Sequence, residues 1–408
     1  MPVLRNIGAL ARCLRSAPSG DAGVVPDAAL AWEGSTIRWA GPDADLPDEF
    51  AAWPSDDAGH RLVVPGLVDC HTHLAFAGWR SDEFALRLRG ATYLQIAAAG
   101  GGIASTVALT RAASTEHLRA RCVSHLAEMA SLGVTTVEAK SGYGLNVEHE
   151  LRLLGIYQSL AAGGQRIVAT LLAAHMIPPE YRDRRASYVE LIEQELIPRV
   201  AREGLARFCD VFVEESAFTI DEARAILLAG KRHGLAPKLH ADQLTSCGGA
   251  ELAAEVGAAS ADHLEKVSEP GIRALAAAGV VAVSLPFASL YLGMAPLPAR
   301  RLLSAGVPVA VATDFNPGSA PSYHLPMAMT LACTLQRMTP AEALRGATVV
   351  AAQALNLDWE IGSLEPGKSA DFAMIDSDSV EHWLYHLRPN ACLRTVARGR
   401  EIWRARAA

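Results

Sequence analysis

Short β-rich runs alternate with longer helical segments between residues 63 and 357. Runs rich in Val and Ile predict strands, and the Ala- and Leu-rich segments after them predict helices. Strands and helices that alternate in this way form a parallel sheet covered by helices. Eight such runs are present: LVVPGLVDCHTH, VTTVEAKSGYG, RIVATLLAAH, RFCDVFVEES, PKLHADQ, ASADHLE, VVAVSLP and VPVAVATDF. Eight strand-helix units predict an α/β fold, a (β/α)₈ barrel of the TIM type.

The two ends of the chain have a different pattern. Residues 1–62 contain short strand-like runs broken by Pro, Asp and Gly, and residues 358–408 alternate apolar and polar positions between turn residues. Both patterns are typical of strands. We therefore expect residues 1–62 and 358–408 to form one small β-sandwich domain beside a barrel of residues 63–357.

The composition restricts the partners of the chain. Its 408 residues are 50% hydrophobic and carry a net charge of −7 without a basic block, which argues against binding to nucleic acid. The seven cysteines show no C-x-x-C spacing, so we expect free thiols in a reducing compartment. No apolar run reaches the roughly 20 residues of a membrane helix. We expect a cytoplasmic protein that acts on a small molecule and does not bind membranes.

Polar and ionisable residues gather at the carboxyl ends of the eight runs. They are His71 and His73, Lys140, His175, Glu214 and Glu215, His240, His263 and Asp314. In a closed barrel the carboxyl ends of the strands converge on one face, where barrel enzymes have their active sites. The predicted fold therefore also predicts a site.

The motif Asp69-Cys70-His71-Thr72-His73 ends the first run. Alternate residues of a strand point to the same side, so His71 and His73 can both offer imidazole nitrogens to one cation. His240 and Asp314, at the ends of two other runs, supply two further ligands. Three imidazoles and a carboxylate suit one divalent metal, Zn²⁺ or Fe²⁺, with a position open to water as in catalytic sites.

Each residue also has an interpretation that needs no metal. An H-x-H pair is a weak signal by itself, Asp314 could cap a turn, and His240 could be a hydrogen-bonded core histidine. His263 is expected to be a base or a water-orienting group, although a ligand role stays open. Lys140 is expected to be structural or ion-paired, although a carbamylated lysine bridging two metals is the alternative.

The motif PGLVDCHTH, followed by single His, His and Asp strand ends, resembles the amidohydrolase superfamily. The segment HTHLAFAGWRSDEFALRLRGATYLQIAAAGGGIASTVALTRAAS resembles the imidazolonepropionase family within it. EAKSGYGL, LLAAHMIP, KLHADQ, ADHLE and ATDFNPGSAP look similar to this family in the same order. The resemblance runs from about residue 60 to the end of the chain.

This resemblance implies hydrolysis of the cyclic amide C–N bond of 4-imidazolone-5-propanoate to N-formimidoyl-L-glutamate, in histidine degradation. The substrate has a carboxylate tail, which Arg80 can hold through two parallel charge-assisted hydrogen bonds. Further residues implied to surround the substrate are Tyr143, His175, Gln243, Asn316, Gly318 and Ser319. Without the resemblance, Arg80 could be a surface arginine paired with Asp82 or Glu83, Tyr143 a packed aromatic and His175 a core histidine.

In the implied mechanism, Asp314 and His263 handle the proton of a metal-activated water. Gln243 can orient the substrate ring but cannot accept a proton as a base. Trp79 stands where the family has a small acidic or amide residue before Arg80, so the resemblance does not specify this part of the pocket wall.

The alternatives are another cyclic-amide hydrolase, an aminohydrolase of heterocyclic amines, or a scaffold protein without activity. Members of this family are commonly homodimers, so we expect one here.

Overall fold

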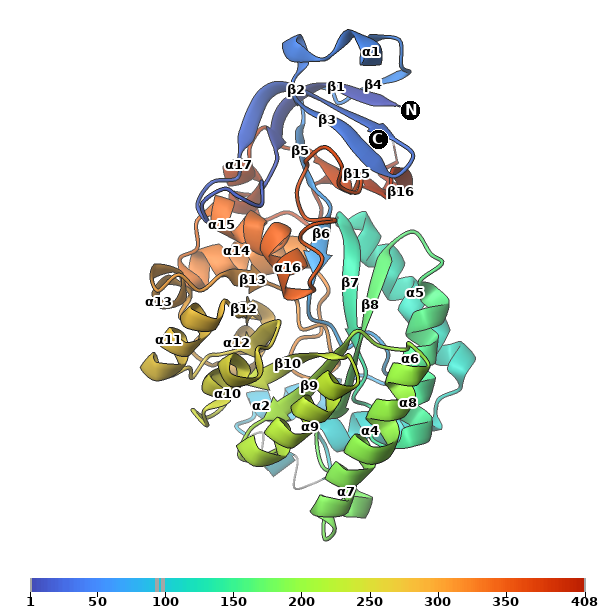
Figure 1. The fold of residues 1–408 in the computed structure, drawn as a ribbon, viewed down its shortest axis with the longest axis vertical. Helices are drawn as coiled ribbons and strands as arrows, with labels where there is room; N and C mark the ends of the chain where they lie inside the picture. The colour runs from blue at the N-terminus through green and yellow to red at the C-terminus, as the bar shows by residue number, and fades with distance from the viewer. Residues whose placement is uncertain (1, 92–94, 97–99, 407–408) are drawn as a thin grey trace.

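The structure is a computed structural model that describes residues 2–91, 95–96 and 100–406. The described part of the chain forms a barrel surrounded by helices and a smaller β domain at one end of it (Figure 1). Each unit is built around an eight-stranded sheet. The (β/α)₈ barrel and the β domain from both chain ends are thus confirmed, and the boundaries at 62/63 and 357/358 stay predictions.

The barrel sheet is parallel and follows the order of the chain from β6 to β13. Its strands are β6 (Leu67–Asp69), β7 (Val134–Lys140), β8 (Arg166–Ala174), β9 (Phe208–Val213), β10 (Ala236–Ala241), β11 (Ser260–His263), β12 (Val281–Ser284) and β13 (Val309–Val311). A bridge between Thr72 and Phe315 joins the chain just beyond β6 to the chain just beyond β13. His73 N also donates to Phe315 O at 2.9 Å. The first and last strands therefore meet, and their polar ends become neighbours.

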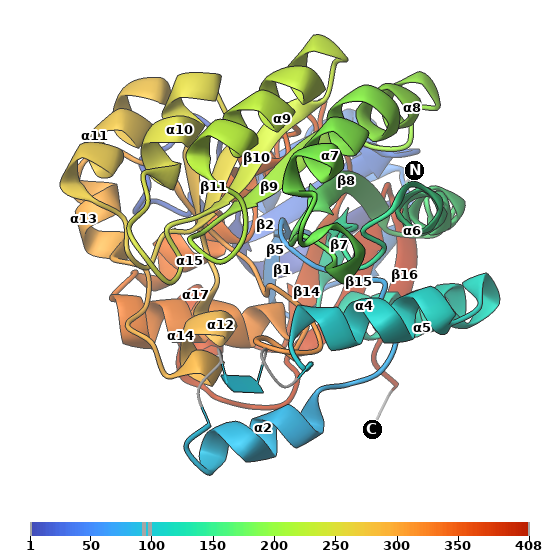
Figure 2. The same cartoon turned by 90° about the horizontal axis from the view of Figure 1, so that it is seen from below.

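Helices follow the strands and surround them, as the view in Figure 2 shows. They are α2 (Ser81–Leu88), α4 (Ile103–Ala112), α5 (Thr115–Ser131), α6 (Val147–Leu160), α7 (Arg185–Leu191), α8 (Ile197–Arg202), α9 (Ile220–Arg232), α10 (Gly249–Val256), α11 (Glu269–Ala278), α12 (Pro286–Leu292), α13 (Ala299–Ser304), α14 (Leu325–Gln336), α15 (Pro340–Gly346) and α16 (Val349–Ala354). A π-helical turn, Ile192–Leu196, connects α7 to α8. No helix in the described ranges combines the length and apolar character needed to cross a membrane.

The second sheet combines strands from both ends of the chain. Its order is β16 (Arg400–Arg404), β15 (Cys392–Ala397), β14 (Phe372–Ile375), β5 (Leu62–Pro65), β1 (Val3–Ala11), β2 (Val24–Glu33) and β3 (Thr36–Pro42), with β4 (Ser55–Asp57) paired to β1. Strand β5 pairs with β1 on one side and with β14 on the other, so it joins the two ends. Two short helices lie between strands of this sheet in the chain: α1 (Asp48–Ala51) between β3 and β4, and α17 (Val380–Tyr385) between β14 and β15.

The run LVVPGLVDCHTH, expected as one barrel strand, is divided between the two sheets. β5 belongs to the terminal sheet and β6 to the barrel, with Gly66 between them. A Cβ at Gly66 would lie 2.3 Å from Thr135 Oγ1, so only glycine lets the chain pass this point. One apolar run therefore serves both units and directs the motif after β6 toward the barrel end far from the terminal sheet (Figure 1).

Candidate active site

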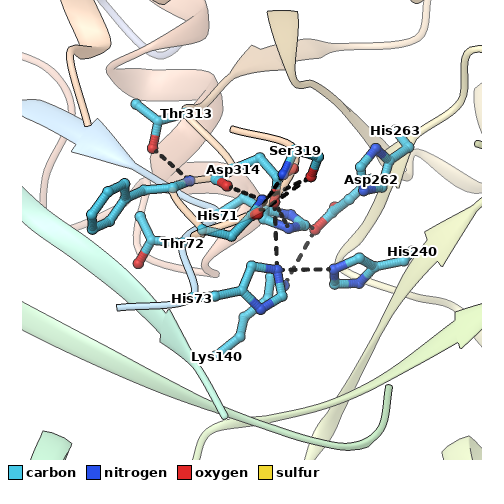
Figure 3. A network of polar contacts seen from close by, with 12 residues as sticks. His71, Thr72, His73, Lys140, His240, Asp262, His263, Thr313, Asp314 and Ser319 are labelled. Atoms are coloured by element: carbon cyan, nitrogen blue, oxygen red, sulfur yellow. Dashed lines mark hydrogen bonds and ion pairs between the residues drawn. The ribbon is translucent and has the colours of Figure 1, made fainter. Parts of the chain in front are cut away.

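The four residues predicted to bind metal converge at the carboxyl ends of the barrel strands (Figure 3). Asp314 Oδ1 lies 3.3 Å from His71 Nε2 and 3.4 Å from His73 Nε2. His240 Nε2 lies 3.5 Å from His73 Nε2. All four side chains are buried. Three ring nitrogens and a carboxylate oxygen therefore point to one small volume.

Two carboxylates fix the orientation of two of these rings. Asp262 Oδ2 lies 2.7 Å from His71 Nδ1, and Asp210 Oδ1 lies 3.2 Å from His240 Nδ1. A carboxylate behind an imidazole keeps the proton on the nitrogen that it faces, so the other nitrogen is free to bind a cation. His71 Nε2 is buried and has no hydrogen-bond partner within the described residues. The donor set thus fits a divalent metal ion.

The surroundings shift the pKa values of these groups in opposite directions. Burial lowers the pKa of His73, and it lowers that of His240 to about 3. Burial and the charge of Lys140 act to lower the pKa of His71, but the carboxylates of Asp262 and Asp314 beside the ring outweigh both and raise the pKa to about 9. Burial would raise the pKa of Asp314, yet His71 and His73 hold it well below its usual range. Because a ligand imidazole has to be neutral, cation binding would displace the proton of His71.

A cluster of five buried charges, which we call the buried ion cluster, supports the two aspartates behind the rings. Lys140 Nζ lies 3.0 Å from Glu138, 2.7 Å from Asp210 and 3.3 Å from Asp262. Lys238 Nζ lies 2.6 Å from Glu138. All five side chains are 0% exposed, so each charge depends on its partners for stabilisation. Lys140 is therefore ion-paired.

A cavity of about 160 Å³ opens beside the candidate metal site. Its walls contain every residue expected to bind the substrate or to act on it. These are Arg80, Tyr143, His175, Gln243, His263, Asp314, Asn316, Gly318 and Ser319. His73 and His240 also line it. The structure thus brings the expected residues together, while their individual roles stay predictions.

Arg80 lies at the start of α2 with its side chain 8% exposed. Its Nε and Nη1 atoms are buried and have no hydrogen-bond partner in the described part of the chain. Glu83 comes no closer than 4.0 Å to the guanidinium, and its Oε1 accepts a hydrogen bond from Gly102 N at 2.7 Å. The alternative of a surface arginine paired with Glu83 therefore leaves these donors without a full partner. An anion in the cavity would satisfy them.

Two aromatic side chains, Tyr143 and His175, lie beside His73 of the candidate metal site. The rings of His73 and His175 stack with centroids 5.1 Å apart, and Tyr143 lies 5.7 Å from His73 and 5.5 Å from His175. The Nδ1 atom of His175 is bonded to Gly142 O at 3.0 Å, and burial holds the pKa of His175 well below its usual range. His175 is therefore a neutral ring whose other nitrogen is left for the cavity.

Asn316 shapes the turn that carries Gly318 and Ser319. Its Oδ1 accepts hydrogen bonds from Gly318 N and Ser319 N, both at 2.8 Å, and its Nδ2 donates to Asp314 O at 2.7 Å. The side chain is thus largely occupied with holding the loop after Asp314 in place. A Cβ at Gly318 would lie 1.2 Å from Arg80 Nη2, so the guanidinium packs directly against this turn.

His263 lies among the proposed ligands. Ligand atoms of His71, His263 and Asp314 lie within 4.8 Å of one another, as do those of His71, His73 and His240. This position is compatible with both roles considered for His263, a metal ligand and a base or water-orienting group beside the metal. Its backbone φ is +79°, and that of Asp314 is +55°. Such left-handed conformations are costly for residues other than glycine and cluster at functional sites.

Several residues of this region were not anticipated from the sequence. The buried ion cluster includes Glu138, Asp210, Lys238 and Asp262, and Arg87 lines the cavity close to Arg80. A detectable signal was present, because charged residues interrupt the strongly apolar runs VTTVEAK, RFCDVFV and PKLHA. A charge inside a buried strand needs a partner of opposite sign.

Comparisons with known proteins agree with this geometry. Residues 62–402 match the model of the amidohydrolase family. An imidazolonepropionase from Anaeromyxobacter dehalogenans strain 2CP-1 is 50% identical over 408 residues, covering 99% of this chain and 96% of that protein. An imidazolonepropionase from Geobacillus thermodenitrificans is 47% identical over 387 residues, covering 94% of this chain and 91% of that protein.

Solved structures of low sequence identity share the fold. Atrazine chlorohydrolase from Arthrobacter aurescens TC1, complexed with zinc, has a TM-score of 0.74 at 18% identity, covering 98% of this chain and 95% of its own. 5-Methylcytosine deaminase from Klebsiella pneumoniae has a TM-score of 0.75 at 17% identity, covering 100% and 98%. The family model and the relatives of about 50% identity place the chain in the amidohydrolase family, among the imidazolonepropionases.

Proposed function

We propose that the chain hydrolyses 4-imidazolone-5-propanoate to N-formimidoyl-L-glutamate by opening the cyclic amide. The observation that carries this proposal is the arrangement of the cavity. Its lining includes residues of the His and Asp cluster, and its wall contains buried N–H groups of Arg80 that have no hydrogen-bond partner among the described residues. A substrate with a hydrolysable ring and a carboxylate tail suits both features. The relatives named imidazolonepropionase support the same reaction.

Enzymes of the amidohydrolase superfamily use a divalent metal, and the chain has a candidate His/Asp site for it. We propose one Zn²⁺ or Fe²⁺ ion held by His71, His73, His240 and Asp314, because imidazole with carboxylate suits both ions. When bound, such an ion supplies a Lewis acid and lowers the pKa of a bound water to about 7.

The side chains of the cavity then position the substrate. Arg80 binds the carboxylate tail through charge-assisted hydrogen bonds, and Ser319 donates a further one. Tyr143 and His175 enclose the ring, and Gln243 orients it through its amide. Because Gln243 has no basic group, proton transfer falls to other residues.

Asp314 and His263 act on the attacking water in different ways. Asp314 accepts a proton from the attacking water, and His263 orients this water beside the ring carbonyl. The proton then passes to the ring nitrogen as the C–N bond breaks. Asn316 and Gly318 keep the loop after Asp314 in register with Arg80 during these steps.

The first experiment follows the ultraviolet absorbance of freshly generated 4-imidazolone-5-propanoate in the presence of the purified protein, with the metal content measured on the same sample. We expect ring opening in the natural protein and its loss in Arg80→Ala with the metal retained. Arg273→Ala, at an exposed position, is the control and should keep full activity.

If the metal-loaded natural protein leaves this substrate unchanged, the proposed reaction is wrong. Neutral cyclic amides and heterocyclic amines would then be the next substrates, because they do not need a carboxylate clamp. The homodimer and the cytoplasmic location stay predictions, which the molar mass in solution and cell fractionation would test.

A further inference from the structure

A buried glutamate lies beside His263. Glu265 follows β11, and its Oε2 is 3.7 Å from His263 Nδ1, with both side chains no more than 3% exposed. Its Oε1 accepts a hydrogen bond from Ser289 Oγ of α12 at 3.0 Å. Neither His263 Nδ1 nor Glu265 Oε2 has a hydrogen-bond partner within the described ranges.

These two buried atoms lie 3.7 Å apart, which is beyond hydrogen-bond distance, and leaving both without a partner carries a large free-energy cost. A buried carboxylate needs hydrogen bonds to both oxygens, and here Ser289 satisfies only one of them. His263 Nδ1 lies 3.7 Å from the second oxygen. A proton on Nδ1 would make the two atoms a donor facing an acceptor, whereas a proton on Nε2 would leave two acceptors facing each other.

The backbone holds the glutamate in this place. His263 and Leu264 both have left-handed conformations, with φ values of +79° and +65°. Leu264 N donates to Ala241 O at 3.0 Å, and Lys266 N donates to Asp242 O at 2.8 Å, so the turn is tied to the end of β10. A turn anchored on both sides of Glu265 keeps the carboxylate beside the ring before any ligand binds.

A related arrangement, with contacts of 2.7 and 3.2 Å that are shorter than the 3.7 Å at His263, occurs at two other histidines of the site. Asp262 faces Nδ1 of His71, and Asp210 faces Nδ1 of His240. In each case the carboxylate determines which nitrogen is left for the centre of the barrel. His263 lines the cavity, so with Nδ1 directed at Glu265 its Nε2 is the nitrogen left for the substrate side.

We infer that Glu265 is a positioning residue for His263. Its carboxylate faces Nδ1 and favours the tautomer with the proton on Nδ1, so that the unprotonated Nε2 can accept a hydrogen bond from the attacking water. Ser289 holds the glutamate in the correct rotamer. This inference rests on the proposed function, because it gives His263 a part in orienting the water of that reaction.

The test compares Glu265→Leu with Glu265→Gln in the metal-loaded protein. Leucine removes the acceptor, so we expect kcat to fall about 10- to 100-fold, with KM within a factor of two and the metal retained. Glutamine keeps an acceptor oxygen for Nδ1–H and can donate its amide hydrogen to Ser289, so it should restore most of kcat. Thermal unfolding would confirm that both variants fold.

Glu251→Leu is the matched control. Glu251 also accepts a hydrogen bond from a serine, Ser268 Oγ at 2.7 Å. Within the described part of the chain it forms no hydrogen bond or ion pair with a histidine. It should keep the kcat of the natural protein. The inference is wrong if Glu265→Leu retains full kcat, if it loses its metal along with activity, or if Glu265→Gln is as slow as Glu265→Leu.

A second measurement is independent of the substrate. Long-range ¹H–¹⁵N correlation on protein with ¹⁵N-labelled histidine, with the His263 signals identified by their loss in His263→Gln, reports which ring nitrogen carries the proton. We expect the proton on Nδ1 in the natural protein. A proton on Nε2 would overturn the inference even if the proposed reaction is correct. A natural protein that has the Nδ1 proton but does not open the ring would instead refute the proposed reaction alone.

Discussion

Arg80 and Gly318 are held in contact so closely that neither can change without affecting the other. A Cβ at position 318 would lie 1.2 Å from Arg80 Nη2 and 1.9 Å from its Cζ. Gly318→Ala should therefore displace the guanidinium and raise KM for the carboxylate substrate. Because hydrogen bonds to charged groups contribute about 1.5–3 kcal/mol, the rise should be about 10- to 100-fold. Steady-state kinetics on the metal-loaded variant would measure it.

Gly155→Ala provides the control for this substitution. A Cβ at Gly155, in α6, would meet no atom of the described residues within 4 Å, so the substitution should leave KM unchanged. A Gly318→Ala protein with the KM of the natural protein would show that Arg80 does not hold the substrate.

At the residue scale, the sequence was informative about side chains at strand ends and uninformative about what lies behind them. His71, His73, His240, His263 and Asp314 could be grouped because each follows a recognisable apolar run. Asp262 and Glu265 also lie in the sequence ADHLE, but their partners are on other strands or helices. Contacts between such distant residues depend on the register of neighbouring strands, which one sequence does not specify.

Among the elements, β7, β9, β10 and β11 are joined across the barrel by the buried ion cluster. Lys140→Met removes the charge that lies between Glu138, Asp210 and Asp262 while keeping a similar side-chain length. Breaking a buried ion pair on one side typically costs about 3–5 kcal/mol, so the free energy of unfolding should fall by about this amount. Urea denaturation would measure the loss, and metal analysis should show weaker retention.

The matched control for Lys140→Met is the same substitution at Lys266, which is exposed. Lys266→Met should alter the free energy of unfolding by no more than about 0.5 kcal/mol. If Lys140→Met is equally harmless, the cluster does not stabilise the barrel in the way proposed here.

The elements themselves could largely be predicted. The eight β-rich runs correspond to β6–β13, since short apolar runs between helical segments are a strong local signal. The split of the first run at Gly66 and the π-helical turn at Ile192–Leu196 could not be predicted. Both arise from packing against distant parts of the chain, such as Thr135 for Gly66, rather than from local preference.

For the molecule as a whole, acid stability should depend on His125. This side chain packs against Phe76 and Phe315 with ring centroids 5.7 and 4.8 Å away. Burial, with a further contribution from Arg121, lowers its pKa to about 4. Between pH 6.5 and 4 the unfolded chain binds a proton at His125 that the folded protein does not, so stability falls as the pH decreases through this range.

His125→Phe should make the free energy of unfolding less dependent on pH across this interval. The comparison needs chemical denaturation of both proteins at pH 7 and at pH 5. An identical pH dependence in the two proteins would contradict the expected contribution of His125.

The sheet shared by the two chain ends affects how the protein is made. β5 leaves the ribosome about 300 residues before β14, its neighbour in the finished sheet. At roughly 5–20 residues per second this corresponds to about 15 s to 1 min of synthesis, during which one edge of β5 has no partner. Unpaired strand edges readily associate with other chains. Chains whose synthesis stops before β14 therefore expose a strand that finished chains cover, which makes interrupted translation a source of aggregation for this protein.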